Sequence, residues 1–185
     1  MRKNFDNPYK VIFNPYLPEK LQANTVVAIV EDFHRNMVIA RVVVNDEYLR
    51  KAKMRDMVVT ASVPAEIIVT EFFAKRLIKK ECCANTMLFH EIGHIHFKHF
   101  LGVVSQEKIR QERIGAILNG GVCDSEIEAD EFAAKVLGKV KVIEALEQLR
   151  NDRYAFDKEH GNLGKTNSVL AIKELDYRIK MLNEA

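Results

Sequence analysis

The stretch that decides the fold runs from residue 86 to residue 100, TMLFHEIGHIHFKHF, and contains the sequence HEIGH at positions 90–94. Its composition predicts a helix, and histidines four residues apart lie on one face of a helix. Both imidazoles can therefore reach a single metal ion. Glu91, offset by about 100° around the helix, flanks the place where a bound water would lie. The spacing predicts His90 and His94 as metal ligands and Glu91 as a catalytic base.

This short pattern needs independent support, because only three of its residues are fixed and such patterns arise by chance in unrelated helices. The alternative is an exposed amphipathic helix that is rich in histidine. The helix is expected to begin at Asn85 or Thr86 and to end at Leu101, before Gly102. Residues with ligand chemistry on a second helix would favour the metal site.

Two acidic residues farther along the chain provide that second signal. In SEIEADEFAAKVLG, residues 125–138, a helical face of small and apolar residues also carries Glu126 and Asp130. Burial of an acid is unfavourable unless the acid is paired or binds a metal. We therefore predict Glu126 as the third metal ligand and Asp130 as the acceptor of a hydrogen bond from a ligand histidine. The small residues would let this helix pack closely on the one that carries His90.

Four other residues with ligand chemistry lie near these motifs. Glu128 projects about 200° away from Glu126 on the same helix, and Cys123 precedes that helix, so both are weaker ligand predictions. His96 and His99 lie about 240° and 180° around their helix from the first ligand histidine. We expect both histidines to face away from the metal and to be surface or packing residues.

The size and charge of the chain limit its class. The chain has 185 residues, 48% of them hydrophobic, which is enough for one domain with its own core. Its 28 basic and 26 acidic residues are interspersed, and this pattern predicts no nucleic-acid partner. We expect a single domain over residues 1–185. Two Asn-Pro pairs predict that residues 1–18 form an arm or loop over it.

Cysteine usage and apolar patterning predict a cytoplasmic protein. There are three cysteines, and two of them, Cys82 and Cys83, are adjacent and poorly placed to pair with each other. The polar N-terminal segment is interrupted by prolines and lacks the apolar stretch of a signal peptide. No segment approaches the roughly 20 apolar residues that span a bilayer, so we expect no membrane span.

The remaining elements predict an α+β fold, mainly helical with a small sheet near the N-terminus. The β-branched runs 25–30 and 37–44 favour a β-hairpin, with a helix over 18–34 as the competing interpretation. Asn45 can cap a short helix, and residues 58–63 can form another strand. Further helices are predicted at 65–80 after a start signal at Ser62 and Pro64, at 105–118, at 124–137 with Asp124 as its cap, at 140–151 and at 167–183.

The two motifs resemble those of gluzincins, the zinc peptidases whose third ligand is a glutamate. The segments HEIGHIHFKHF and EIEADEFAAKVLG are similar to those of soluble M48-like peptidases, a family that includes the Ste24 and HtpX types. The ImmA/IrrE-type peptidases are the second choice, and asparagine usually stands there where this chain has Asp130. The resemblance implies a zincin-like fold and one Zn²⁺ ion held by His90, His94 and Glu126.

These observations predict a zinc-dependent endopeptidase that hydrolyses a peptide or protein substrate through a metal-activated water, with Glu91 as general base. Developing oxyanion charge needs a further donor. The sequence leaves four candidates open for it, His160, Tyr154, Tyr177 and Arg178. The alternative is an ImmA/IrrE-type regulatory metalloprotein that acts on a transcriptional repressor by cleavage or by binding. Glu91 favours the enzyme, because a structural metal needs no general base.

Overall fold

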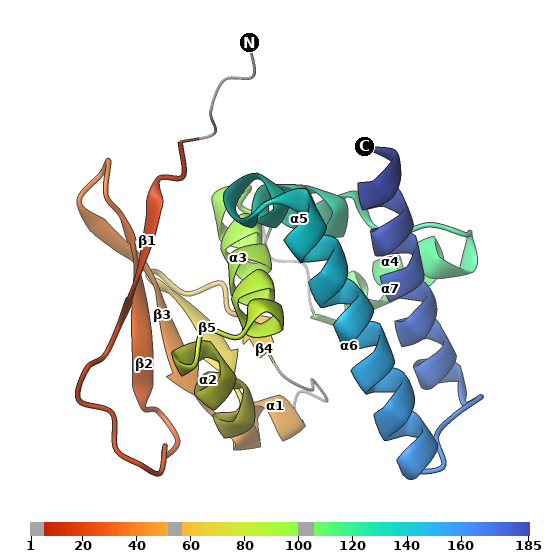
Figure 1. Cartoon of the computed structure of the whole chain (residues 1–185), viewed down its shortest axis with the longest axis horizontal. Helices are drawn as coiled ribbons and strands as arrows, with labels where there is room; N and C mark the ends of the chain where they lie inside the picture. The colour runs from red at the N-terminus through yellow and green to blue at the C-terminus, as the bar shows by residue number, and fades with distance from the viewer. Residues whose placement is uncertain (1–5, 52–56, 100–105) are drawn as a thin grey trace. The chain divides into compact units, whose positions relative to one another are not determined.

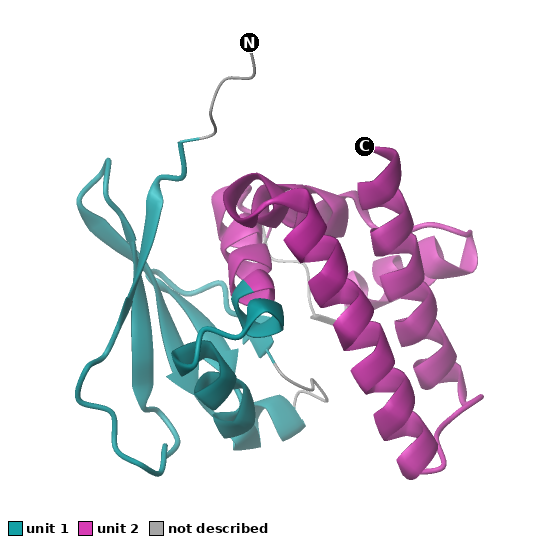
Figure 2. Ribbon diagram, in the orientation of Figure 1, with its two compact units in different colours: residues 1–85 teal, residues 86–185 magenta. Residues whose placement is uncertain are grey.

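The computed structural model of the chain describes residues 6–51, 57–99 and 106–185. The chain divides into two compact units, residues 1–85 and residues 86–185 (Figure 2). Figure 2 shows that the strands, labelled in Figure 1, all belong to the first unit and that the second is built from helices. The described residues contain five strands and seven helices, which confirms the α+β class predicted from the sequence.

Unit 1 is built on one sheet with the strand order β1-β2-β3-β5-β4. Neighbouring strands run antiparallel, except that β3 and β5 are parallel. Two short helices, α1 and α2, follow β3 and β5 in the chain. The bounds of these elements are β1 Tyr9–Phe13, β2 Val26–Asp32, β3 Met37–Val44, α1 Asp46–Lys51, β4 Met57–Val59, β5 Ala65–Val69 and α2 Glu71–Ile78.

The predicted hairpin is confirmed by β2 and β3, and the competing helix over 18–34 is wrong. The two strands are rich in β-branched residues, and Val27, Val30 and Val42 are fully buried. The turn between them contains Asn36 at φ 51°, a left-handed conformation that asparagine tolerates better than most residues. The helix predicted after Asn45 is also present as α1, where the Asn45 side chain accepts a hydrogen bond from the Tyr48 backbone N–H.

The N-terminal segment differs from the arm expected over residues 1–18. Its central part, Tyr9–Phe13, forms the edge strand β1, which pairs with β2. The two Asn-Pro pairs lie on either side of this strand, and the five residues between them include the β-branched pair Val11 and Ile12. The prolines therefore mark the ends of a strand, because proline cannot continue a ladder of backbone hydrogen bonds.

The helix predicted over residues 65–80 is wrong in its first third. Ala65–Val69 form the strand β5 instead, between β3 and β4, where Ile67 and Val69 are fully buried. The helix begins only at Glu71, because the Thr70 side chain accepts a hydrogen bond from the Phe73 N–H and caps it. A short apolar run fits either period, and sheet pairing decides this one. The strand predicted over 58–63 is present but shorter, as β4.

The helices that follow match the predicted ones, except that the helix predicted over 140–151 continues to Glu159. Their bounds are α3 Cys82–His96, α4 Gln106–Leu118, α5 Asp124–Leu137, α6 Lys139–Glu159 and α7 Thr166–Glu184. Helix α3 starts earlier and ends earlier than predicted, and its predicted end at Leu101 and Gly102 lies outside the described residues. Cys123 occupies the N-cap of α5, so the predicted cap Asp124 is the first helical residue. Gly138 ends that helix at φ 97°, as glycine can.

The core of unit 2 lies between α5, α6 and α7. Its fully or nearly fully buried members come from all three helices and are Ala133, Val142, Leu146, Ile179 and Leu182. Phe89 of α3 packs against this cluster. The C-terminal helices therefore hold α5 in place, and α3 is joined to the same core.

Gly93 lets the backbones of α3 and α5 approach each other closely. A Cβ atom at this position would lie 2.9 Å from the Cα of Ala129 and 3.2 Å from the Cβ of Phe132. The first distance is shorter than real side chains allow, and the atom it meets belongs to a backbone. A glycine inside α3, which by itself weakens a helix, is therefore required by the packing.

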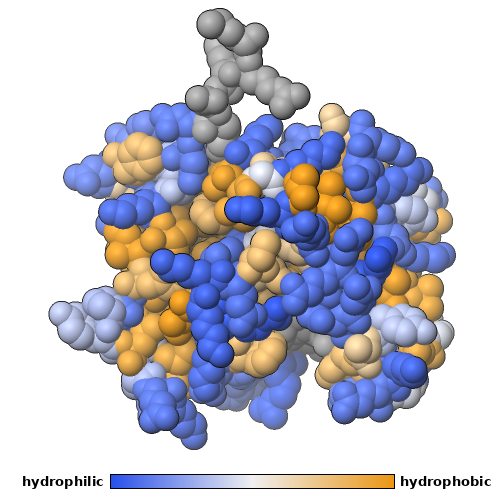
Figure 3. All heavy atoms as spheres, viewed as in Figure 1, coloured by the Kyte–Doolittle hydropathy of each residue, from blue (hydrophilic) through white to orange (hydrophobic). Residues whose placement is uncertain are grey.

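On the face shown in Figure 3, hydrophobic residues gather in separate patches with hydrophilic residues between them. Within the part of the chain that the structure describes, none of the helices combines the length and the apolar character needed to cross a membrane.

We expect Gly93→Ala to destabilise the protein, because the added methyl group has to push α5 away from α3. Overpacking by one methyl group costs about 1–3 kcal/mol, and the better helix propensity of alanine returns up to about 1 kcal/mol. Urea denaturation should show a net loss of stability. Gly115→Ala on α4 is the matched control, because nothing lies within 4 Å of a Cβ atom there. A Gly93→Ala variant as stable as Gly115→Ala would contradict the close approach.

Candidate metal centre

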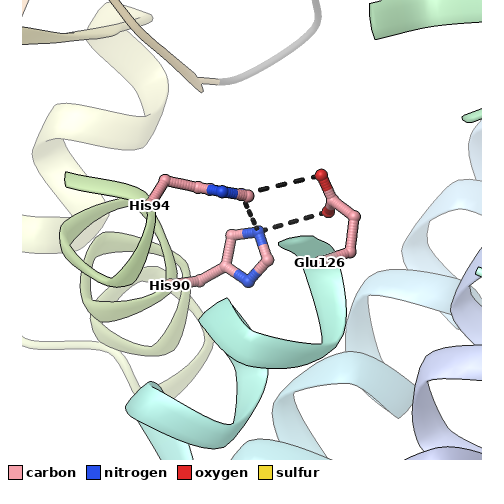
Figure 4. A group of neighbouring side chains, drawn as sticks. All are labelled: His90, His94 and Glu126. Atoms are coloured by element: carbon pink, nitrogen blue, oxygen red, sulfur yellow. Dashed lines mark hydrogen bonds and ion pairs between the residues drawn. The ribbon is translucent and has the colours of Figure 1, made fainter. Parts of the chain in front are cut away.

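Three side chains from two helices of unit 2 converge on one point. His90 and His94 lie one turn apart on α3, and Glu126 lies in the first turn of α5. All three are buried, with 2%, 5% and 5% of their surfaces exposed. Figure 4 shows both rings and the carboxylate turned toward each other. The structure thus brings together the three ligands predicted from the sequence.

The distances between the ligand atoms match the size of a tetrahedral metal site. The Nε2 atoms of His90 and His94 are 3.1 Å apart. Glu126 Oε2 lies 3.3 Å from His90 Nε2, and Glu126 Oε1 lies 3.6 Å from His94 Nε2. Zinc binds these atom types at about 2.0–2.2 Å, so ligand atoms in a tetrahedral site are separated by roughly 3.3–3.5 Å. This buried group could hold a metal ion.

Asp130 lies one turn after Glu126 on α5 and holds the other nitrogen of the first histidine. His90 Nδ1 is 2.8 Å from Asp130 Oδ1, so its Nε2 atom is left for the metal. Arg178 of α7 donates two hydrogen bonds to the same carboxylate, from Nε at 2.7 Å and from an Nη atom at 2.6 Å. Burial alone would raise the pKa of Asp130, but Arg178 and His90 together lower it to about 2. Asp130 is therefore a carboxylate at neutral pH.

Glu126 lies between two arginines. One Nη atom of Arg178 is 3.7 Å from Oε2, and one of Arg113 is 3.5 Å from Oε1. Arg113, on α4, is itself anchored by Glu174 of α7 at 2.8 Å. Burial raises the pKa of Glu126, but Arg113 and the neighbouring histidines outweigh burial and hold this pKa well below its ordinary value. The ligand oxygen atoms are thus kept in the charged form that binds a cation.

The pKa values of the two candidate ligand histidines are shifted in opposite directions in the metal-free protein. Burial and Arg178 oppose protonation of His90, but Asp130 and Glu126 raise its pKa to about 9. Burial and the charge of His90 lower the pKa of His94 to about 3. A metal ion at this site would therefore compete with the proton on His90.

Glu91 lies on α3 next to the first ligand and is 9% exposed. Among the described residues, none forms a hydrogen bond or an ion pair with its carboxylate. Burial raises its pKa above the ordinary value, although the charge of His90 acts in the opposite direction. A carboxylate in such surroundings accepts a proton more readily than one in water, as a general base must.

The prediction that His99 faces away from the ligands is wrong. Helix α3 ends at His96, and Lys98 adopts φ 60°, so the chain turns back instead of continuing around the helix. The Nδ1 atom of His99 lies 2.8 Å from Nδ1 of His94. His99 Nε2 lies 2.8 Å from Glu128 Oε2. Angles around an ideal helix did not apply beyond its last turn, and the sequence held no signal for this contact.

The other candidates lie as follows. His96 packs against the Phe132 ring at a centroid distance of 5.0 Å, in line with the predicted packing role. Of the four oxyanion candidates, Arg178 is held by Asp130 and Glu126. The other three, Tyr154, Tyr177 and His160, form no hydrogen bond or ion pair with the three ligands in the described part of the chain. Cys123 lies at the N-cap of α5 and is partly buried.

Comparisons with known proteins add no assignment. No protein-family model matches the chain, and searches of the curated proteins and of the solved structures find no match. The chemistry of the site must therefore be argued from its own residues.

Removal of one ligand should abolish metal binding. Glu126→Gln keeps the size of the side chain but removes the charge and leaves an amide facing two histidines. We expect metal analysis to find about one zinc ion per wild-type chain and close to none in the variant. Glu131→Gln, a partly exposed acid of the same helix paired with Lys135, is the matched control and should bind as the wild type does. Zinc retained by Glu126→Gln would exclude this residue as a ligand.

Arg178→Met should be strongly destabilising, because it removes the guanidinium that donates two hydrogen bonds to the buried Asp130 carboxylate and leaves His90 as its remaining partner. Loss of one member of a buried ion pair costs about 3–5 kcal/mol. Arg150→Met is the control, since the ion pair of Arg150 with Asp176 is partly exposed and such pairs contribute about 1 kcal/mol or less. The free energy of unfolding in urea, measured without metal, should separate the two variants. Equal losses would show that the Arg178 pair does not stabilise the fold.

Proposed function

We propose that the chain is a zinc-dependent endopeptidase with a zincin-like catalytic centre. The observation that supports this most directly is the set of three buried ligand atoms at separations of 3.1, 3.3 and 3.6 Å, with a buried carboxylate beside the first ligand. Two histidines and a glutamate are the ligand set of catalytic zinc sites that leave a fourth position open. A purely structural zinc site is usually closed by four protein ligands.

Zinc bound by His90, His94 and Glu126 would polarise a substrate carbonyl and lower the pKa of water toward about 7. Glu91 then accepts the proton of the attacking water. The same carboxyl group passes that proton to the leaving amine, so that one residue acts first as base and then as acid. Its raised pKa suits both roles, because the proton has to be taken up and released near neutral pH.

The charged residues around the ligands prepare the site for this chemistry. Asp130 orients the His90 ring, and Arg178 fixes Asp130 on its other side. Arg113 and Glu174 form a further ion pair beside Glu126. Ligands that are held in place before the metal and substrate arrive need little rearrangement during the reaction. A peptide or protein substrate and a cytoplasmic location belong to the same proposal, and they rest on the sequence.

The test is hydrolysis of casein and of unfolded proteins by the zinc-loaded chain. Glu91→Gln should lower the rate by about 10²–10⁴-fold, the usual contribution of a general base. It should keep its zinc, since Glu91 is not a ligand in this site. Glu131→Gln again serves as the control, with unchanged activity.

Equal rates of hydrolysis by the wild type and Glu91→Gln would contradict the role of Glu91 as general base. Zinc binding without hydrolysis of any of these substrates would instead favour the regulatory alternative. In that case binding to candidate transcriptional repressors should be measured next.

A further inference from the structure

The second ligand histidine is connected to the protein surface through two further side chains. His94 Nδ1 lies 2.8 Å from His99 Nδ1, and His99 Nε2 lies 2.8 Å from Glu128 Oε2. The His99 side chain is 13% exposed, and that of Glu128 is 53% exposed. The line of contacts thus runs from a buried ligand to a carboxylate in contact with solvent.

The chemistry of the three groups sets the direction of both hydrogen bonds. A carboxylate has only acceptor oxygens, so His99 Nε2 donates to Glu128. When His94 binds a metal through Nε2, its Nδ1 carries the ring proton, and His99, as a neutral imidazole that donates from Nε2, accepts at Nδ1. His94 Nδ1 must then be the donor, and the free lone pair of His94 lies on Nε2. That atom is the one that faces His90 and Glu126.

We propose that His99 and Glu128 are positioning residues that fix the tautomer and the ring orientation of His94 for metal binding. This inference rests on the proposed metal site and adds to it two residues that do not touch the metal. The two ligand histidines are thereby supported in different ways. His90 is held directly by Asp130, a buried carboxylate, whereas His94 is held through a second histidine.

The surroundings of His99 show that its position is well defined. Its backbone N–H donates to the carbonyl oxygen of His94 at 3.1 Å, so the residue is tied to the C-terminal end of α3. Its ring stacks on Phe97 with a centroid distance of 5.6 Å and an interplanar angle of 19°. The ring is therefore restrained on its face by Phe97 and on both nitrogens by hydrogen bonds. A ring held in this way can orient another ring.

The competing explanation is that His99 merely ends the helix and fills space. Two variants separate the explanations. His99→Phe keeps a ring that can stack on Phe97 but removes the acceptor, whereas His99→Asn places an amide oxygen near the position of Nδ1 and keeps an acceptor. His96→Phe is the matched control, because His96 belongs to the same helix end and packs on Phe132.

The measurements are zinc affinity by competition with a chromophoric chelator, the visible absorption of the Co²⁺-loaded protein, and urea unfolding without metal. We expect His99→Phe to lower the zinc affinity by about 10–100-fold, as loss of a partner of a ligand histidine does, and to change the Co²⁺ spectrum. His99→Asn should recover part of the affinity. His96→Phe should bind zinc as the wild type does.

The contribution of Glu128 is measured by a double-mutant cycle. Glu128→Ala should weaken zinc binding in the presence of His99 and have no further effect in His99→Phe, because Glu128 acts only through that ring. If Glu128→Ala weakened zinc binding equally in the wild type and in His99→Phe, the proposal that Glu128 acts through His99 would be overturned. If His99→Phe fails to fold, His99→Asn and Glu128→Ala still decide, since unchanged affinity in both would contradict the proposal.

The outcomes also separate this inference from the proposed function. A wild-type chain that binds no zinc would contradict both the positioning role and the proposed function. A wild-type chain that binds zinc, together with His99→Phe of equal affinity and equal Co²⁺ spectrum, would overturn only the positioning role. The same would follow if His96→Phe weakened binding as much as His99→Phe, because the loss would then be a general effect of altered packing.

Discussion

The burial of two carboxylates on one face of α5 is the constraint on which the rest of unit 2 depends. Glu126 and Asp130 are 5% and 1% exposed, and acids this deeply buried must be paired or must bind a cation. Their partners come from three other helices: the histidines from α3, Arg113 from α4 and Arg178 from α7. The same interactions that make burial tolerable therefore assemble the candidate metal site.

Close packing and ligand geometry are linked at this site. Because Gly93 has no side chain, the backbone of α5 can approach α3, and the carboxylate of Glu126 comes within 3.3 Å of His90. The arginines then balance negative charge without entering the ligand set, since they hold the carboxylates at distances of 2.6–3.7 Å. The side chains of this candidate metal site are thus held by ion pairs with residues of three helices.

The sequence was most informative where a motif coincided with a regular helix, and least informative at helix ends and in short apolar runs. The spacing of His90, His94, Glu126 and Asp130 placed all four on the correct faces, because the helical period holds over one or two turns. The segment Ala65–Val69 was misjudged as helix, since five residues carry no decisive period and their pairing with β3 is a tertiary interaction. His99 was misjudged because the left-handed Lys98 reverses the chain.

By itself the sequence determined the class of the fold, the hairpin, the main helices and the four residues of the two motifs, because these follow from local periodicity and from the unfavourable burial of acids. Only the tertiary structure decided how the ligands are supported. The pairs Arg113 with Glu126, His99 with Glu128 and Arg178 with Asp130 are 13, 29 and 48 positions apart in the chain, and no local pattern encodes which of many charged residues will meet. The packing of α7 against α4 and α5 made that choice.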